Sequence, residues 1–187
     1  LGFVSLLGTY ATPFRLAFPA LLAGPAEDFF SLLCRFPNVL QTVFDVAVTL
    51  PEVTFSVLSK LSFVGGHADR AVFRNNVQSV AGVEKRVYLR TLLSLADHDA
   101  SDVLPLLRCP VLVIAGKQDQ LTPPRVAKHM ADRVPTATYR EVNGGTHFAL
   151  IEEAELIDLW IKEFAQKIFF KPDRVSVGAA ALVTPQP

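Results

Sequence analysis

Two stretches of the chain are short and almost entirely apolar, and each ends at a glycine. Residues 1–7 (LGFVSLL) run into Gly8, and residues 111–115 (VLVIA) run into Gly116. Apolar runs of this length that contain β-branched residues are typical of strands buried in a parallel sheet. The pattern therefore predicts a core strand over residues 1–7 and a second strand, buried on both faces, over residues 111–115.

The chain after this second strand switches between helical and strand patterns. Apolar residues recur at helical spacing over residues 123–134, and Pro135 ends this predicted helix. Thr122 precedes the helix and is expected to cap the free amides of its first turn. Residues 138–142 (TYREV) alternate, which predicts a short strand near the edge of the sheet. Residues 149–168 carry a broad apolar face and are predicted to form one last helix.

The long middle of the chain has a helical pattern only. From residue 14 to about residue 98, strand alternation does not persist and aromatic and aliphatic residues are abundant. Proline and glycine divide this region into successive helical stretches, with breaks at Gly24-Pro25, Pro37, Pro51 and Gly65-Gly66. The pattern predicts an all-helical insertion between the two apolar strands.

These patterns divide the chain into four segments. A core strand with its loop occupies residues 1–13, a helical cap residues 14–98, and an α/β core residues 99–170. Residues 171–187 (KPDRVSVGAAALVTPQP) are small and proline-bearing without a helical stripe, so they are expected to form a tail or linker.

Composition narrows the classes of partner. Half of the 187 residues are hydrophobic, mean hydropathy is +0.33, and 18 basic residues balance 18 acidic ones. Balanced charge argues against a nucleic acid or an anionic surface as partner. The apolar run at residues 1–7 is far shorter than the roughly 20 residues that span a bilayer, so no integral membrane segment is expected. Cys34 and Cys109 are expected to be buried free thiols, which fits a cytoplasmic location.

Two polar residues follow the predicted strands at positions suited to acid–base chemistry. Asp119 lies three residues after Gly116, at the carboxyl end of the buried strand, where open α/β sheets place their active sites. His147 follows a turn that contains Gly144 and Gly145, and glycine accepts the backbone angles of a sharp turn. One strand–helix–strand unit separates the pair, so neighbouring loops can bring the two side chains together. A carboxylate that holds one imidazole nitrogen leaves the other free to take a proton from a nucleophile.

These segments resemble the C-terminal portion of α/β-hydrolase-fold enzymes of the capped esterase, lipase and C–C hydrolase type. PVLVIAGKQDQLTPP is similar to the family's segment with the catalytic acid, and VNGGTHFALIEEAELI to its segment with the catalytic histidine. The resemblance covers residues 1–13 and 100–168, and implies that Asp119 is the triad acid and His147 the base. The implied fold class is α/β, with three parallel strands, flanking helices and an all-helical cap insertion.

The chain departs from the family's pattern in one respect. The family carries its nucleophile on a G-x-S-x-G elbow before the acid and the histidine. No serine here lies between glycines at that spacing, and neither does Cys34 or Cys109. We therefore expect a C-terminal fragment without the first strands, the oxyanion loop and the nucleophile, and hence inactive alone. An elbow is expected roughly 25–30 residues before Leu1 in the coding sequence, because a helix must fit between elbow and strand.

The resemblance implies a serine-type hydrolase that acts on an ester, a thioester or an activated C–C bond. The apolar cap favours a hydrophobic small-molecule substrate, because ligand pockets are lined mostly by apolar side chains. Thr9 and Tyr10, in the loop after the first strand, are candidate substrate-binding residues, together with Phe148 beside His147. Thr9 and Tyr10 can instead be turn residues that pack under the cap.

Two other interpretations stay open. If the missing nucleophile is an aspartate, the same pair would serve a dehalogenase or an epoxide hydrolase, in which His147 activates water. The chain can also be a non-catalytic binding module or the product of a truncated reading frame. No cofactor and no metal are expected, because no zinc-like spacing links His67, His98 and the nearby residues Asp69, Asp97 and Asp99. The sequence gives no indication of the oligomeric state.

Overall fold

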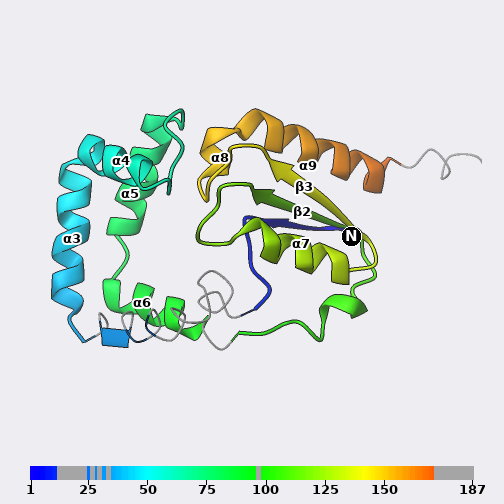
Figure 1. The fold of residues 1–187 in the computed structure, drawn as a ribbon, viewed down its shortest axis with the longest axis horizontal. Helices are drawn as coiled ribbons and strands as arrows, with labels where there is room; N and C mark the ends of the chain where they lie inside the picture. The colour runs from blue at the N-terminus through cyan, green and yellow to red at the C-terminus, as the bar shows by residue number, and fades with distance from the viewer. Residues whose placement is uncertain (12–24, 26–27, 29–30, 33–34, 96–97, 171–187) are drawn as a thin grey trace, which may run out of the picture.

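Three parallel strands, in the order β1-β2-β3, form the centre of the structure (Figure 1). This computed structural model describes residues 1–11, 25, 28, 31–32, 35–95 and 98–170. The central strand pairs on both sides: Val113 of β2 aligns with Ser5 of β1 and with Tyr139 of β3. The strands are β1 (Phe3–Leu6), β2 (Val111–Gly116) and β3 (Ala137–Val142). The predicted fold class, three parallel strands with flanking helices, is confirmed.

Every residue of β2 is buried, because both faces of the strand are covered. Successive side chains of a strand point to opposite faces. Val113 accordingly packs on one face with residues of α7, while Leu112 and Ile114 pack on the other with residues of α9. β3 has a mixed burial pattern and lies at one edge of the described sheet, as its alternating sequence predicted. The elements that cover the sheet are η1 (Leu104–Leu106), α7 (Pro124–Arg133) and α9 (Ala154–Phe169).

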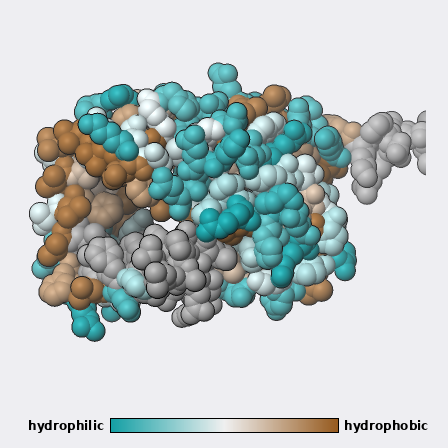
Figure 2. Space-filling view, viewed as in Figure 1, coloured by the Kyte–Doolittle hydropathy of each residue, from teal (hydrophilic) through white to brown (hydrophobic). Residues whose placement is uncertain are grey.

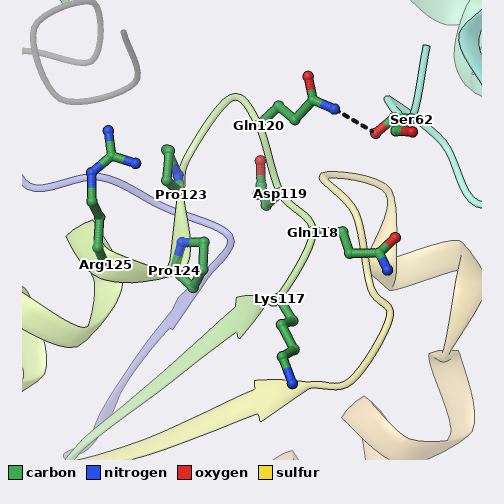
Figure 3. Close-up of a pocket in the computed structure, with 8 residues that line it drawn as sticks. All are labelled: Ser62, Lys117, Gln118, Asp119, Gln120, Pro123, Pro124 and Arg125. Carbon is green, nitrogen blue, oxygen red and sulfur yellow. Dashed lines mark hydrogen bonds between the residues drawn. The ribbon is translucent and has the colours of Figure 1, made fainter. Parts of the chain in front are cut away.

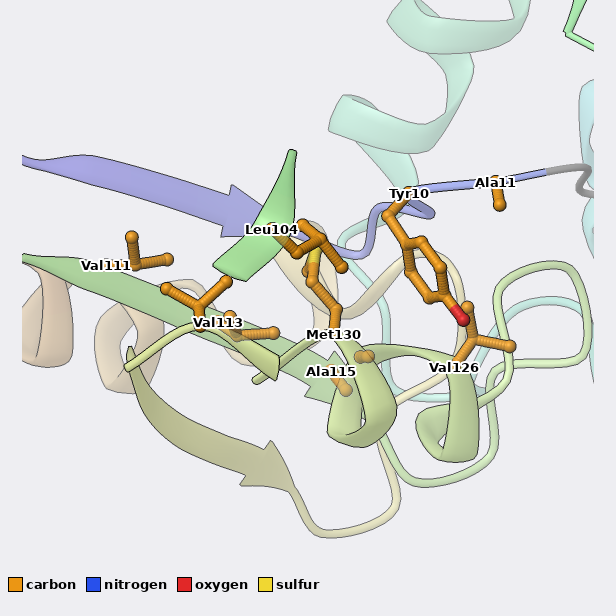
Figure 4. Packing of buried hydrophobic residues seen from close by; sticks show 10 residues of the cluster. Tyr10, Ala11, Leu104, Val111, Val113, Ala115, Val126 and Met130 are labelled. Carbon is orange, nitrogen blue, oxygen red and sulfur yellow. The ribbon is translucent and has the colours of Figure 1, made fainter. Parts of the chain in front are cut away.

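The α7 side of the sheet holds the larger apolar cluster of the core. Figure 4 shows Met130 and Val126 of α7 beside Val113 and Ala115 of β2, with Leu104 of η1 closing the cluster. On the other side, Ile157 of α9 is fully buried, and the partly buried side chains of Trp160, Ile161 and Phe164 complete the cover. Burial of this kind stabilises by about 25 cal/mol for each Å² of apolar surface removed from water. The two clusters hold β2 between them and so fix where its carboxyl end lies.

Two local predictions about helix ends are wrong. Thr122 does not cap α7: the helix begins at Pro124 after Pro123, with no side-chain cap, and the Thr122 hydroxyl bonds elsewhere. The predicted last helix is two helices, α8 (Ala149–Glu152) and α9, because Glu153 has the non-helical angles φ −132° and ψ 45°. A helix-compatible sequence does not reveal this break, since the contacts of α8 are with distant residues.

In the part of the chain that the structure describes, four α-helices lie between β1 and β2 in sequence and stand to one side of the sheet (Figure 1). We call these helices and the loops that join them the cap: α3 (Pro37–Thr49), α4 (Pro51–Lys60), α5 (Arg70–Ala81) and α6 (Lys85–Ser94). The buried apolar cluster of the cap lies between α4 and α5 and consists of Phe55, Phe73 and, in the loop that joins the two helices, Val64 and Ala68. Two partly buried residues pack against this cluster: Phe148, which immediately precedes α8, and Ile151, which belongs to α8. The cap therefore rests on the segment that follows His147.

The predicted segment boundaries stay predictions. The helical stretches expected before residue 37 fall mostly on residues 12–24, 26–27, 29–30 and 33–34, which lie outside the described residues. Residues 96–97, Cys34 and the expected tail 171–187 also lie outside them. Cys109 is a partly buried free thiol.

The outward surface of the cap is apolar. Seven aliphatic side chains of α3, α4 and the residues that follow them are about half exposed: Val39, Val43, Val46, Leu50, Val53, Val57 and Leu61. Figure 2 shows hydrophobic residues gathered at the same side of the molecule. Within the described residues, none of the single helices is both long and apolar enough to cross a membrane; the bent pair Gln41–Thr49 and Pro51–Lys60, at 105°, passes the test of length and composition together.

Candidate active site

The loop after β2 wraps around the carboxylate of Asp119. Asp119 Oδ1 accepts hydrogen bonds from the backbone N–H groups of Leu121 and Thr122, both at 2.8 Å. Asp119 Oδ2 accepts one from the Thr122 hydroxyl at 2.7 Å. A short aspartate side chain readily binds the backbone two and three residues ahead, which closes the loop on itself. The carboxylate is thus held in one orientation before any partner is considered.

The loop after β3 is positioned by direct backbone contact with this acid loop. Gly144 has φ +82°, a left-handed angle that glycine adopts without steric cost. Gln118 N–H then donates to the carbonyl of Gly145 at 2.8 Å. A Cβ on Gly116 would lie 2.6 Å from the carbonyl oxygens of Gly145 and Thr146, so only glycine permits this approach. The glycines at the strand end and in the turn therefore allow the two loops to meet.

His147 and Asp119 form a hydrogen-bonded pair. His147 Nδ1 lies 2.9 Å from Asp119 Oδ2. The aspartate side chain is fully buried, whereas the histidine side chain is 34% exposed. Within the described residues, Nε2 of His147 has no hydrogen-bond partner. This arrangement leaves one imidazole nitrogen held and the other available for proton transfer.

The pKa of the Asp119 carboxyl lies below its ordinary value. Burial raises this pKa, but the hydrogen bonds from His147 and from the backbone and hydroxyl of Thr122 together lower it by more than burial raises it. Hydrogen bonds to the charged form stabilise that form. Asp119 therefore stays ionised at neutral pH, as a carboxylate that stabilises a charged imidazolium must.

Thr122 connects the acid loop to the loop after β1. Its hydroxyl lies 2.8 Å from the carbonyl of Leu7 and 3.3 Å from His147 Nδ1, besides its contact with Asp119. Leu7 has φ +50°, an angle that costs a non-glycine residue roughly 1–2 kcal/mol. One hydroxyl proton serves one acceptor at a time, so Thr122 donates either to Leu7 or to Asp119. In the sequence, Thr122 is marked only by its place between the acid and a proline, a pattern that also fits a helix cap.

The candidate substrate-binding residues lie in different surroundings. The Thr9 hydroxyl donates to the carbonyl of Ala11 at 2.7 Å. Tyr10 is buried in the α7 cluster, and its hydroxyl lies 2.5 Å from Nδ1 of His129. Phe148 is partly buried, with its ring centroid 6.4 Å from that of His147 in an edge-on arrangement. Phe148 thus lies next to His147, whereas the side chains of Thr9 and Tyr10 form their hydrogen bonds with other residues. A role of these three residues in substrate binding stays a prediction.

A shallow pocket opens beside the acid loop (Figure 3). Gln120 extends across it toward the cap, and its side-chain amide donates to the carbonyls of Leu61 at 3.3 Å and Ser62 at 3.5 Å. The other residues that line it are Lys117, Gln118, Asp119, Pro123, Pro124 and Arg125. The residue next to the buried acid is therefore in contact with the cap.

No group of three or more metal-binding side chains occurs in the described part of the chain. Nε2 of His67 lies 3.4 Å from Oε1 of Glu153. Asp69 caps α5 by accepting from the N–H groups of Ala71 and Val72.

Comparisons with known proteins agree with this architecture. A family model described as "alpha/beta hydrolase fold" matches residues 10–154, well over half of the chain. A pimeloyl-[acyl-carrier protein] methyl ester esterase of Vibrio campbellii is 29% identical over 134 residues, which are 69% of this chain and 52% of that protein. A proline iminopeptidase of Lactiplantibacillus plantarum is 42% identical over 60 residues, 32% of this chain and 21% of the peptidase. The chain thus spans at most about half the length of these relatives.

A solved structure shows the same fold over most of the chain. It is a lipase-esterase related protein of Clostridium acetobutylicum, with a TM-score of 0.57 and 18% identity. The match covers 87% of this chain and 55% of that protein. At this identity the likeness supports the fold and its topology.

Proposed function

Because the chain belongs to the alpha/beta hydrolase fold family, we propose that its protein is a serine-type hydrolase that cleaves an ester, a thioester or an activated C–C bond with the Asp119–His147 pair. The observation that carries the proposal is the hydrogen bond of 2.9 Å between a fully buried carboxylate and a partly exposed imidazole whose second nitrogen is available. A carboxylate and an imidazole in this arrangement form the acid–base part of a catalytic triad.

The proposed reaction on an ester proceeds in two halves. His147 Nε2 takes the hydroxyl proton of the nucleophile as its oxygen attacks the acyl carbon, and Asp119 stabilises the imidazolium that forms. The imidazolium returns the proton to the departing alkoxide, which leaves as an alcohol, and the acyl group remains on the nucleophile. Water then loses a proton to His147 Nε2 while its oxygen attacks the acyl carbon. The bond between the acyl carbon and the nucleophile's oxygen breaks, the imidazolium returns its proton to that oxygen, and the carboxylic acid is released.

The nucleophile is proposed to come from sequence outside these 187 residues. None of their serines has the G-x-S-x-G surroundings that expose a nucleophile at the end of a strand. We propose that a strand and elbow of this kind lie beside β1, and that the 187 residues alone are inactive.

A hydrophobic small-molecule ester is the proposed substrate. Phe148 lies beside His147 and packs on Phe73 of the cap at a centroid distance of 5.8 Å, which provides apolar surface next to the imidazole. Apolar and aromatic side chains line most small-molecule pockets. The names of the relatives include a methyl ester esterase and a peptidase, so carbonyl compounds are the substrates to test first.

The assignment of the pair is tested by two substitutions in the protein expressed from its complete coding sequence. Asp119→Asn and His147→Ala are each expected to lower kcat for p-nitrophenyl butyrate by about 10³- to 10⁴-fold, because the base is misoriented or lost. Circular dichroism checks that both variants remain folded. Asp158→Asn and His98→Ala, at exposed positions, are the matched controls and should retain the wild-type kcat. Near-normal turnover in folded Asp119→Asn or His147→Ala would overturn the proposal.

The origin of the nucleophile has its own test. A fluorophosphonate probe should label one serine of the complete protein, and mass spectrometry should place it outside residues 1–187. The isolated 187 residues should neither be labelled nor hydrolyse the ester. A labelled serine inside them would contradict this part of the proposal. Turnover without serine labelling would favour the aspartate nucleophile of a dehalogenase or an epoxide hydrolase.

A further inference from the structure

Glu152, at the end of α8, binds the turn that carries His147. Its Oε2 accepts from the backbone N–H of Thr146 at 2.8 Å, and its Oε1 accepts from the Thr146 hydroxyl at 2.5 Å. Thr146 is buried and immediately precedes His147, and its hydroxyl also accepts from the N–H of Phe148 at 3.1 Å. Both neighbours of His147 in the chain are therefore tied, directly or through Thr146, to the Glu152 carboxylate.

The same carboxylate also holds the cap. Glu152 Oε1 accepts from the backbone N–H of Gly65 at 2.6 Å, a contact between residues 87 positions apart. We call residues 61–69, which connect α4 to α5, the cap loop. Next to this bond, Asp69 N–H donates to the carbonyl of Ile151 at 3.2 Å. A Cβ on Gly65 would lie 3.1 Å from the Glu152 carboxyl, so glycine allows the cap loop to come this close.

Glutamate is well suited to this position. Its three partners, the two N–H groups and the Thr146 hydroxyl, all present a hydrogen, because the hydroxyl oxygen already accepts from Phe148. An ionised carboxylate is an acceptor only, whereas the amide of glutamine would turn its own NH₂ toward at least one of these donors. Although glutamine has nearly the same shape as glutamate, it therefore cannot accept all three hydrogen bonds.

We propose that Glu152 is a positioning residue that couples the seating of the cap loop to the orientation of His147. The inference rests on the proposed function and assigns the regulation of the same site. When the cap loop leaves Glu152, the carboxylate loses one of its three donors and the turn around Thr146 loosens, so His147 drifts from Asp119. A seated cap loop and an aligned acid–base pair then occur together. Because Nδ1 of His147 must face Asp119 for proton transfer, the coupling acts on kcat more than on KM.

Hydrogen exchange tests the coupling without requiring activity. In the protein expressed from its complete coding sequence, Glu152→Gln should speed amide exchange about tenfold in both the cap loop (61–69) and the histidine turn (144–149), and leave β2 unchanged. Glu155→Gln is the matched control: it makes the same change at an exposed residue of α9 and should alter neither segment. Faster exchange in the histidine turn alone would show that Glu152 stabilises only its own turn, and would overturn the proposal.

A variant on the cap side covers the case in which Glu152→Gln unfolds the protein. Gly65→Ala pushes on the Glu152 carboxyl from the cap loop and changes no residue of the histidine turn. It should speed exchange in residues 144–149 as well as in 61–69. Faster exchange confined to 61–69 would overturn the coupling.

The kinetic readout separates this inference from the proposed function. Glu152→Gln is expected to lower kcat for p-nitrophenyl butyrate about tenfold with KM changed less than about twofold, and Glu155→Gln to leave both unchanged. A wild-type protein without hydrolase activity would contradict the proposed function, and the exchange data would still decide whether Glu152 couples the two segments. An active protein in which Glu152→Gln raises KM alone would overturn the positioning role.

Discussion

The sheet and the cap differ in how completely their apolar side chains are buried. β2 is covered on both faces, and Val113 and Ile114 have no exposed surface. The cap has a cluster of four buried residues and exposes rows of valine and leucine along α3 and α4. The cap completes its cluster with Phe148 and Ile151, which belong to the segment after His147.

The elements that hold the Asp119–His147 pair are therefore different from the elements that can move near it. The Asp119–His147 pair lies on loops joined by backbone hydrogen bonds to the ends of β2 and β3. The cap meets the acid loop and the segment around α8 through the packing of Phe148 and Ile151 and through a few hydrogen bonds, among them those of Glu152 with Gly65 and of Gln120 with Leu61 and Ser62. Segments with few buried apolar contacts open at lower free energy than a core strand. We expect the cap to open while the sheet remains intact.

The largest effect is expected from a charge placed in the sheet. Val113→Asp buries a carboxylate without a partner and should lower the free energy of unfolding by more than about 4 kcal/mol, or abolish folding. Val43→Asp makes the same substitution in α3, where the side chain is 58% exposed, and should cost less than about 0.5 kcal/mol. Urea unfolding followed by circular dichroism measures both. Equal losses would show that the cap surface is as tightly packed as the sheet.

The next effect concerns the cap cluster itself. Phe73 packs edge-on against Phe55 at 5.1 Å and against Phe148, so Phe73→Ala should cost about 3 kcal/mol of local stability. Hydrogen exchange should then accelerate in α4 and α5 but not in β2. Ile114→Ala, which opens a cavity in the sheet, should accelerate exchange in β2 and leave exchange in the cap nearly unchanged, because the cap exchanges through its own opening at lower free energy. If Phe73→Ala also destabilises β2, cap and sheet unfold as one unit.

The smallest effect is electrostatic and depends on pH. The folded-state pKa of Asp119 lies below the unfolded value of about 3.9, so its stabilisation is complete above that value and is lost as pH falls through the folded-state pKa. Asp119→Asn should therefore cost about 2 kcal/mol at pH 7 and nothing at a pH below the folded-state pKa. Urea titrations from pH 2 to pH 7 measure this difference, which should persist in 1 M salt.

Glu52 of the cap provides the contrast for this last prediction. Hydrogen bonds from Arg74 and Arg70 lower the pKa of its exposed carboxyl. Salt screens exposed ion pairs far more than buried ones. Any loss of stability in Glu52→Gln should disappear in 1 M salt, and persistence there would show that this ion pair is less exposed to solvent than the structure indicates.

The parts of the site that could be predicted depend on neighbours in the chain. The strand before Asp119 and the glycine turn before His147 are visible because strand periodicity and glycine angles are local properties. The role of Thr122 was not predicted, because one partner of its hydroxyl, Leu7, lies 115 residues away and the other, Asp119, lies before the predicted helix. Glu152 lies in the stretch that the sequence predicts as one continuous helix, and its bond to Gly65, 87 positions away, has no local signature.

Local patterns in the chain were enough to predict the parallel strands, the helical region between the first two of them, and the order in which the acid and the histidine follow their strands. These features depend on which residues lie within a few positions of one another, and apolar spacing records that information directly. The tertiary structure decided that Nδ1 of His147 faces Asp119, that Thr122 reaches Leu7, and that one carboxylate serves both Thr146 and Gly65. A hydrogen bond between distant residues depends on distances of a few ångströms, and these are set only when the sheet and the cap have packed.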